Sequence, residues 1–415
     1  MNSAIRHSVG LGAAAIALVS FSASVSNRSL DDWPQWRGTK RDGMSLEKGL
    51  LKTWPKEGPP AAWRVTGAGA GYSSFATAHG RLYTLGARGG TEYAMAFDAA
   101  SGKKLWEVPH GRQFGNDRGD GPRATPTVDG DRLYVFGASG DLAAMEAATG
   151  RSLWKVNVLE KFGGSNIRWG LSESPLVLND RVLVSPGGSG ASIVALKKTD
   201  GSLLWKSLAD EAGYSSAVLH EAGGVRQAIY FTAERALGVD VETGSLLWSY
   251  NQVANRTANI ATPIVRGNKV FLSSGYSTGA ALLELTPSNG RVDAKQVYFT
   301  REMRNHHASS VLVGEHLYGF SDAILMAMKF DNGEVAWRDR SVGKGSVIFA
   351  DDRLYLYSEQ GLVGLAEPSP SGYREHGRFQ IPTGNLPTWS HPVVSNGRLF
   401  IRDQDTLFAF DVRQK

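Results

Sequence analysis

The chain has 415 residues, and its 45 Lys and Arg against 40 Asp and Glu leave a formal net charge of +5 at pH 7. So small a surplus, without any run of basic residues, excludes the concentrated positive surface that nucleic-acid binding requires. Hydrophobic residues make up 42%, which excludes disorder along the whole chain. The absence of Cys excludes disulfides, thiolate metal sites, iron–sulfur clusters and a cysteine nucleophile. The 49 Gly and 11 Trp predict many tight turns and repeated large apolar anchors.

The first 26 residues have the pattern of a secretory signal peptide. Arg6 and His7 give a positive start, Val9–Phe21 is apolar and uncharged, and small residues follow up to Ser26. The apolar stretch is too short for an ordinary membrane span, and an uncleaved anchor is the alternative. No later stretch is long and apolar enough to cross a bilayer. We therefore expect a periplasmic or secreted protein without a transmembrane span once the signal is removed.

Two phrases recur along the chain and predict its fold. In the first, an acidic or polar residue leads to a turn that ends in Gly, and Trp follows four residues later. Clear copies lie at 98–106, 146–154, 198–205, 240–248 and 331–337, and copies that keep the Gly but lose the Trp lie at 288–290 and 371–372. In the second, a small hydroxyl residue leads through a polar turn to an aromatic-rich strand, as in Thr125–Tyr134 and Thr262–Phe271.

The second phrase occurs eight times, with a period of roughly 43–51 residues where the unit is intact. Each unit contains four short β-type runs separated by Gly, Asn or Asp turns, and no stretch keeps a helical period. The pattern predicts an all-β fold: an eight-bladed β-propeller of four-stranded antiparallel blades around a central channel.

The two ends of the repeat region predict how the ring closes. The chain stops after Thr406–Asp411, the third strand of the last unit, whereas Ala61–Val65 has the pattern of an orphan fourth strand with its own Trp. Pairing these segments would close the ring and remove two exposed strand edges. The expected organisation is a signal peptide over 1–26, an N-terminal arm that packs on the propeller over 27–61, and the propeller over 62–415.

The Gly–Trp phrase, best seen at 240–248 and 98–106, resembles the tryptophan-docking motif of PQQ-like propellers. That superfamily includes the eight-bladed quinoprotein alcohol dehydrogenases and a non-enzymatic lipoprotein of the outer-membrane β-barrel assembly machinery. The resemblance covers residues 62–415, and Asp32–Gly38 resembles the opening of short, secreted members. WD-repeat and kelch propellers fit less well, because Trp follows the turn Gly at a fixed offset.

The chain departs from both kinds of relative. Quinoprotein alcohol dehydrogenases carry a vicinal disulfide, a calcium-ligand set and a catalytic aspartate, whereas this chain has no Cys and no residue-by-residue match to the other two. The assembly lipoprotein is anchored through a Cys that is also absent here. The resemblance therefore implies the fold and implies neither activity.

In such a propeller, the loops that enter the innermost strands open on one face, around the channel mouth. We expect polar and aromatic residues of these loops to converge although they are distant in sequence. The expected cofactor- or ligand-binding residues are Tyr72, Arg123, Trp169, Tyr214, Asn259, His307, Lys344, Trp389 and His391, with Arg168 beside Trp169. Charged donors and flat rings suit an anionic, planar or sugar-like ligand, such as a quinone or an acidic saccharide. The alternative is a hydrated mouth without a specific ligand.

Two residues are candidates for catalysis. Glu173 is the best carboxylate for a general base or calcium ligand, and His306 is a candidate acid/base or ligand. Because adjacent residues on a strand face opposite ways, we expect His306 and His307 not to hold one metal ion together, and we expect no metal site. The Arg-Asp-Gln-Asp stretch at 402–405 is expected to be a solvated turn between two strands of the last blade.

The absence of a transferable catalytic set favours a binding or scaffold propeller over an enzyme. We expect a monomer that takes a small-molecule or saccharide ligand, or a protein partner, at the propeller face. One alternative is an oxidoreductase of alcohols or sugars that uses pyrroloquinoline quinone with Ca²⁺, whose carboxylates the Arg and Lys side chains would hold. A weaker alternative is a polysaccharide-active hydrolase or lyase that uses Glu173 with a His.

Overall fold

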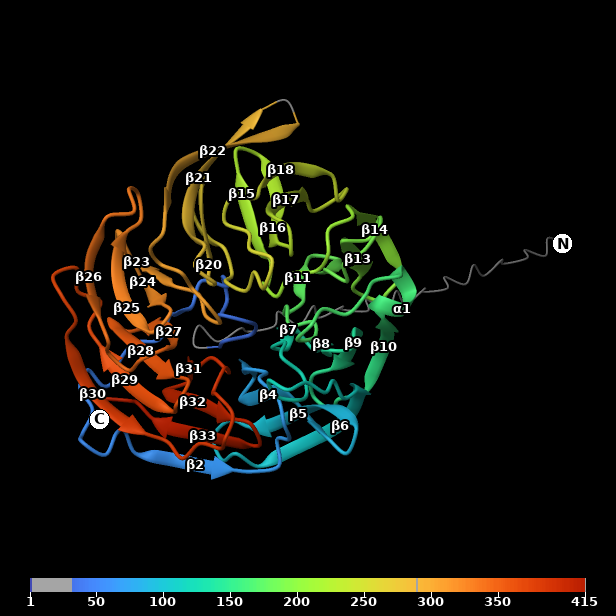
Figure 1. Cartoon of the computed structure of the whole chain (residues 1–415). Helices are drawn as coiled ribbons and strands as arrows, with labels where there is room; N and C mark the ends of the chain where they lie inside the picture. The colour runs from blue at the N-terminus through green and yellow to red at the C-terminus, as the bar shows by residue number, and fades with distance from the viewer. Residues whose placement is uncertain (2–31, 289, 415) are drawn as a thin grey trace.

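The computed structural model describes residue 1, residues 32–288 and residues 290–414, so the expected signal peptide lies outside the described residues apart from Met1. Eight sheets stand like blades around a central axis (Figure 1). The prediction of an all-β, eight-bladed propeller is confirmed. The described residues contain one α-helix, α1 (Val158–Phe162). No helix among these residues is long and apolar enough to span a membrane.

Each blade begins with an inner strand and ends with an outer strand at the rim. The first blade comprises β3 (Ala76–Ala78), β4 (Arg81–Arg88), β5 (Thr91–Asp98) and β6 (Lys104–Arg112), and the second comprises β7 (Thr127–Asp129), β8 (Arg132–Phe136), β9 (Asp141–Glu146) and β10 (Ser152–Asn157). The third blade comprises β11 (Leu176–Leu178), β12 (Arg181–Val184), β13 (Ile193–Lys197) and β14 (Leu203–Ser207), and the fourth comprises β15 (Val218–Ala222), β16 (Val225–Phe231), β17 (Ala236–Asp240) and β18 (Leu246–Tyr250). The fifth blade comprises β19 (Ile264–Arg266), β20 (Lys269–Ser274), β21 (Gly279–Ser288) and β22 (Arg291–Thr300), and the sixth comprises β23 (Val311–Val313), β24 (His316–Ser321), β25 (Ile324–Lys329) and β26 (Val335–Asp339). The seventh blade comprises β27 (Gly345–Ala350), β28 (Arg353–Ser358), β29 (Leu362–Ala366) and β30 (Glu375–Gln380). The eighth comprises β31 (Val393–Ser395), β32 (Arg398–Asp403) and β33 (Thr406–Asp411), together with β2 (Ala61–Val65).

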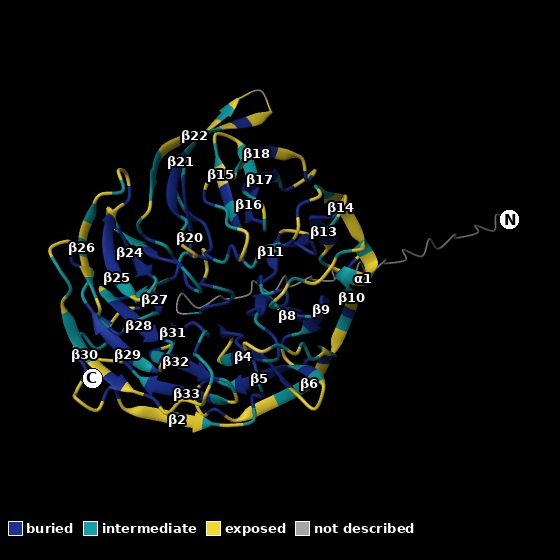
Figure 2. Cartoon of the chain, in the orientation of Figure 1, coloured by how far each residue is buried: buried dark blue, intermediate teal, exposed yellow. Residues whose placement is uncertain are grey.

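The position of a strand in its blade decides its composition. The middle strands β8 and β9 are almost entirely buried, because each sheet packs against neighbouring blades on both faces. The outer strand β14 is largely exposed, and Leu203 and Leu204 keep 42% and 40% of their surface in solvent. The same gradient, from a buried interior to an exposed rim, runs around the whole ring (Figure 2).

The last blade is completed from the front of the chain, as the sequence predicts. Strand β2 pairs antiparallel with β33, from Ala61 opposite Phe410 to Val65 opposite Leu407. The closing strand therefore spans Ala61–Val65, the segment that the sequence predicts for it. The seventh sheet differs from the expected four strands, because β1 (Met44–Ser45) of the arm pairs in parallel with β27 and gives a five-stranded order. The arm thus contributes to the sheets as well as covering them.

In five blades the recurrent Trp joins one blade to the next, whereas Trp248 of the fourth blade donates to Gln227 of its own blade. The indole Nε1 of Trp154 donates to the carbonyl oxygen of Lys198 at 3.0 Å, and its ring lies against Gly201. Gly201 has φ +70°, and a Cβ there would come within 2.8 Å of the Trp154 ring, so the turn requires Gly. Equivalent bonds run from Trp63 to Ala99, from Trp106 to Ala147, from Trp205 to Val241 and from Trp337 to Ser369. In the fifth blade Tyr298 takes this place and donates its hydroxyl to the carbonyl of Phe330 at 2.9 Å.

The N-terminal arm crosses the central channel, where its ribbon is visible in blue inside the ring (Figure 1). Trp33 is tied to the inner strand β3 by two hydrogen bonds with Thr77, at 2.8 and 2.9 Å. Arg37 and Arg41 are 2% and 3% exposed, and both donate to backbone carbonyls beside the inner strands of the propeller. The acceptors are Ser309 and Ser310 for Arg37, and Ser174, Pro175 and Ala217 for Arg41. Burial lowers the pKa of each guanidinium to about 10, so both remain charged at neutral pH. Charge-assisted bonds therefore hold the arm between the inner strands.

Residues 402–405 form the expected turn, but only part of it is solvated, since Arg402 and Asp403 are buried and Asp405 is exposed. Arg402 is 0% exposed and donates to the carbonyl oxygens of Ser73 and Gly69 at 3.2 and 3.0 Å. Asp405 accepts from the backbone N–H groups of Gly67 and Gly69 at 3.0 and 2.7 Å. The turn is at the expected position, but the Gly-rich segment before the first blade lies on it. Its charges therefore hold the seam between the last and first blades.

Candidate functional site

A cavity of about 570 Å³ lies at the channel mouth, within the range of about 300–1,000 Å³ that is typical of small-ligand sites. Its lining takes at least one residue from the loop that precedes the inner strand of every blade. In blade order these residues are Tyr72; Arg118 and Arg123; Arg168, Trp169 and Ser172; Tyr214 and Ser216; Thr257 and Ile260; His306 and His307; Lys344; and Pro387 and Trp389. Trp36 of the arm also lines the cavity, together with Tyr276 and Glu359 from turns between second and third strands.

The structure brings together most of the residues that the sequence assigns to the mouth. Those that line the cavity are Tyr72, Arg123, Trp169, Tyr214, His306, His307, Lys344 and Trp389, with Arg168. Glu173, Asn259 and His391 lie outside the lining. The repeat therefore predicts which loops converge, whereas the direction of each side chain depends on local packing.

Glu173 is buried beneath the loop that carries Trp169. It is 3% exposed, and its carboxylate accepts a hydrogen bond from the backbone N–H of Ser185. Burial raises the pKa of Glu173 to about 8, although the nearby Arg41 guanidinium acts in the opposite direction. A carboxyl in this position holds the loop together and does not reach a molecule in the cavity.

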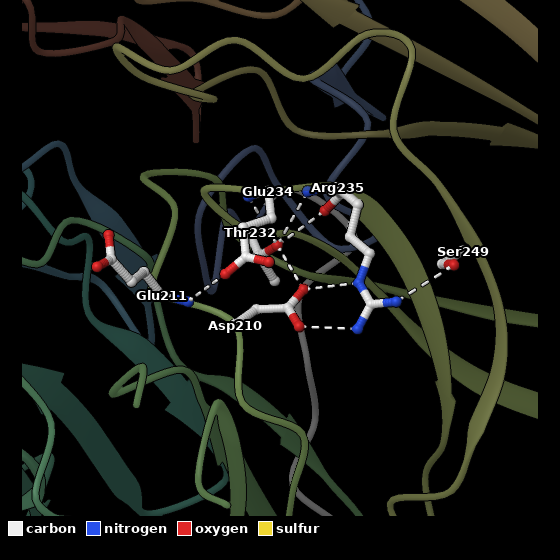
Figure 3. A network of polar contacts seen from close by, with 6 residues as sticks. All are labelled: Asp210, Glu211, Thr232, Glu234, Arg235 and Ser249. Atoms are coloured by element: carbon white, nitrogen blue, oxygen red, sulfur yellow. Dashed lines mark hydrogen bonds and ion pairs between the residues drawn. The ribbon is translucent and has the colours of Figure 1, made fainter. Parts of the chain in front are cut away.

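Asn259 has a positioning role in the fourth and fifth blades. The Asn259 side-chain amide donates to the backbone carbonyl oxygen of Thr232 at 2.9 Å, and the backbone carbonyl oxygen of Asn259 accepts from the backbone N–H of Tyr214 at 3.0 Å. A second anchor joins the loop before β15 to the turn between β16 and β17. Arg235 donates to both oxygens of Asp210 at 2.8 Å, and Thr232 donates to Asp210 at 3.0 Å (Figure 3). These bonds fix the loop that presents Tyr214 to the cavity.

His391 lies behind the arm. Its ring centroid is 4.5 Å from that of Trp36, and burial lowers the pKa of His391 to about 3, so it is neutral. The Trp36 indole donates to Thr262 Oγ1 at 2.9 Å, which fixes this ring of the arm in the cavity lining. The arm thus adds an aromatic ring to the cavity lining, and His391 lies outside that lining, with its Nε2 3.4 Å from the carbonyl oxygen of His307.

Aromatic rings form pairs around the cavity wall. Tyr72 and Trp389 have ring centroids 4.9 Å apart, and Trp169 and Tyr214 have centroids 5.6 Å apart. These pairs come from neighbouring blades, so the packing of the blades sets their spacing. Flat faces of this kind stack on planar or ring-shaped groups.

Cationic side chains outnumber carboxylates among the lining residues. Among the residues that the structure describes, Arg118, Arg123, Arg168 and Lys344 face one lining carboxylate, that of Glu359. Arg123 is held by a bond to the carbonyl of Gly119 at 2.6 Å and lies 4.9 Å over the Phe114 ring, and burial lowers its pKa. The guanidinium of Arg168 lies 5.1 Å over the Trp169 ring. This balance attracts an anion, and guanidinium groups offer paired donors to a carboxylate or phosphate.

The opposite wall carries the His pair beside Glu359. The Glu359 carboxylate accepts from Trp389 Nε1 at 2.7 Å and lies 3.1 Å from Lys344 Nζ and 3.5 Å from His307 Nδ1. His306 and His307 lie in the loop between β22 and β23, not on a strand as the sequence suggests. Strand alternation therefore does not separate them, and both ring systems approach Glu359. Burial lowers the pKa of His306 and, more strongly, that of His307, so both imidazoles are neutral near pH 7.

The residues that sequence reasoning missed include Glu359, Tyr276, Trp36 and Arg118. The first two had a usable signal, because turns between second and third strands open on the same face as the loops that enter inner strands. Trp36 belongs to no repeat unit, so the period gives no information about its place.

The lining does not fit a calcium-bound quinone. Calcium takes about six to eight oxygen ligands, mostly carboxylates and carbonyls. The cavity offers the carboxylate of Glu359, which already contacts Trp389 and Lys344, while Glu173 and Asn259 are engaged outside the lining. The cationic and aromatic side chains of the lining fit an anion in general, and they provide no ligands for a calcium ion.

The family model described as outer membrane protein assembly factor BamB matches residues 90–339, which is more than half of the chain. This chain belongs to that family. The resemblance to PQQ-like propellers is thereby confirmed, and the expected periplasmic or secreted location is in keeping with this membership.

Individual proteins of this family show the same likeness. The outer membrane protein assembly factor BamB of Shewanella oneidensis is 25% identical over 377 residues, covering 85% of this chain and 88% of that protein. The BamB of Yersinia pestis is 24% identical over 332 residues, covering 73% of this chain and 76% of that protein.

Solved structures share the fold at low identity. BamB from Moraxella catarrhalis superposes with a TM-score of 0.59 at 16% identity, covering 85% of this chain and 97% of that one. Quinohemoprotein alcohol dehydrogenase from Comamonas testosteroni gives a TM-score of 0.66 at 12% identity, covering 93% of this chain and 81% of that one. At these identities the likeness shows the fold alone.

Proposed function

We propose that this protein is an exported, non-catalytic, monomeric propeller that binds an acidic segment of a partner protein in its channel-mouth cavity. Family membership supports a protein partner, since relatives are named as assembly factors for outer membrane proteins. Export rests on the signal peptide that we propose for residues 1–26, ahead of an arm over 27–61 and the propeller over 62–415.

The observation that carries the proposal is the composition of the cavity wall. Among the described lining residues, three Arg and one Lys converge with one carboxylate, in a concavity that the Trp36 ring also lines. Arg118 and Arg168 come from the loops before the second and third blades, so two guanidinium groups from different loops can bind one acidic segment. Charge-assisted bonds to carboxylates contribute about 1.5–3 kcal/mol each, which makes such a wall selective for acidic side chains.

The same wall argues against the enzymatic alternatives. A quinone with calcium lacks its oxygen ligands, as described above. Most glycoside hydrolases need two carboxyl groups that flank the scissile bond. Glu359 is the carboxylate of the lining, and Glu173 is buried with its carboxylate bonded to Ser185. A binding role needs neither arrangement.

The test is a titration of the purified chain with a fluorescent ten-residue glutamate peptide, followed by fluorescence anisotropy. We expect saturable binding that weakens with salt, and no comparable binding of a Gly-Ser peptide of equal length. Arg118→Gln combined with Arg168→Gln should lower the affinity about tenfold or more, because two charge-assisted contacts are lost.

The matched control is Arg291→Gln combined with Lys295→Gln, which removes the same charge from exposed positions on β22. This pair should change the affinity less than twofold. Equal weakening in both double variants would show general charge attraction and would contradict a cavity site. Dye-linked alcohol oxidation after addition of pyrroloquinoline quinone and calcium would favour the oxidoreductase alternative.

A further inference from the structure

We propose that His306, His307 and Glu359 form a site for a divalent transition-metal ion, with zinc as the best chemical match, in the wall of the cavity. One ring nitrogen from each His and one carboxylate oxygen lie within 4.8 Å of one another. Neutral imidazole nitrogens together with a carboxylate oxygen are a common zinc ligand set. The site goes beyond the proposed function, which requires no metal.

Two neighbouring blades hold the three ligands in place. The His pair lies in the loop before β23, and Glu359 lies in the turn between β28 and β29 of the next blade. Asn305 anchors the His loop, since it is 2% exposed and its side chain donates to the carbonyl of Phe320 at 3.0 Å. The Trp389 indole orients the Glu359 carboxylate at 2.7 Å. Supporting bonds of this kind position metal ligands in proteins.

The ring nitrogens of the His pair are the independent observation that points to a ligand. Both nitrogens of His307 and the Nδ1 of His306 are buried and have no hydrogen-bond partner among the residues that the structure describes. The His307 side chain is 8% exposed, and its Nδ1 lies 3.5 Å from Glu359. Buried polar atoms without partners are rare because each costs about 1–3 kcal/mol. A metal ion would give the lone pairs of both rings a partner.

Binding requires a small closure of the site and a movement of Lys344. Zinc bound about 2.1 Å from each ligand holds the ligand atoms roughly 3.5 Å apart, so any pair of ligand atoms needs to approach by at most about 1.3 Å. Lys344 Nζ lies 3.1 Å from Glu359, and its side chain is 26% exposed, so it can turn into the cavity. The ammonium group and the metal compete for the same carboxylate. Three protein ligands leave a coordination position for water or an anionic group, as in other open zinc sites.

The experiment is a zinc titration of the purified full chain in competition with a chromophoric chelator. We expect one zinc per chain, and cobalt should give visible absorption bands of a four- or five-coordinate site. Glu359→Gln and His306→Ala should each lower the zinc affinity about tenfold or more. Lys344→Met should raise the zinc affinity, because it removes the competing cation. Misfolding cannot produce that increase.

His376→Ala is the matched control, since His376 lies 3.2 Å from Glu367 in a two-residue pair elsewhere on the ring. It should leave the stoichiometry and affinity unchanged. The proposal is overturned if zinc does not bind stoichiometrically, if His376→Ala weakens binding as much as His306→Ala, or if Lys344→Met weakens it. Peptide anisotropy measured in the presence of a chelator tests the proposed function separately, so either proposal can fail alone.

Discussion

The two faces of the ring follow different rules. On the face that carries the turns between third and fourth strands, one contact recurs in six blades: an aromatic residue of the outer strand donates to a carbonyl of the next blade, as Trp154 does to Lys198. On the opposite face every blade contributes a different side chain to the cavity, from Arg123 to Lys344. The repeating face therefore supports the ring, and the non-repeating face carries the chemistry. Substitutions on the first should change stability, and substitutions on the second should change binding.

The largest effect that we expect is on the repeating face. Trp154→Ala should lower the free energy of unfolding by about 4 kcal/mol, because it removes a large buried ring and its bond to the next blade. Denaturant-induced unfolding measures this change, and the acidic-peptide affinity of the folded protein should remain the same. Trp154→Phe should cost less than Trp154→Ala. A loss of peptide binding in Trp154→Ala without a loss of stability would break the distinction between the faces.

A smaller effect should separate Glu173 from the cavity that it lies beneath. Its folded-state pKa of about 8 lies above the ordinary value of 4.5, so folding favours the protonated carboxyl. This stabilising contribution is fully present below about pH 4.5 and is lost as the pH rises through 8. Glu173→Gln does not titrate and keeps an acceptor for the Ser185 N–H. The variant should therefore gain about 4 kcal/mol over the native chain between pH 5 and pH 9.

Thermal and denaturant unfolding at both pH values measure this gain. Peptide binding should not change in Glu173→Gln, because the carboxyl does not line the cavity. If the variant instead loses peptide binding at constant stability, Glu173 belongs to the binding site, and its placement outside the cavity lining is wrong.

The smallest effect concerns the one blade that uses Tyr in place of Trp. Tyr298→Phe removes the hydrogen bond to the carbonyl of Phe330 and should lower the free energy of unfolding by about 1 kcal/mol. Tyr250→Phe is the control, because its exposed hydroxyl contacts Gln296 and its loss should be close to neutral. Denaturant midpoints compare the two variants. Equal midpoints would show that the Tyr298 bond adds nothing to blade docking.

The sequence located the cavity better than it described the individual side chains. Tyr72, Trp169 and Trp389 line the cavity as expected, because each precedes an inner strand and the ring brings those loops together. Asn259 also precedes an inner strand, yet the bonds that it makes within the blades engage its side chain. The period specifies the loop, whereas packing within the loop specifies which way a residue points.

The sequence alone determined the eight-bladed ring and its closure by Ala61–Val65, because each unit repeats a local pattern of turns, strands and a docking residue. Only the tertiary structure decided the course of the arm through the channel and the approach of the His pair to Glu359. Those contacts join residues that no shared period relates. They depend on how whole blades pack around the axis, which local pattern does not encode.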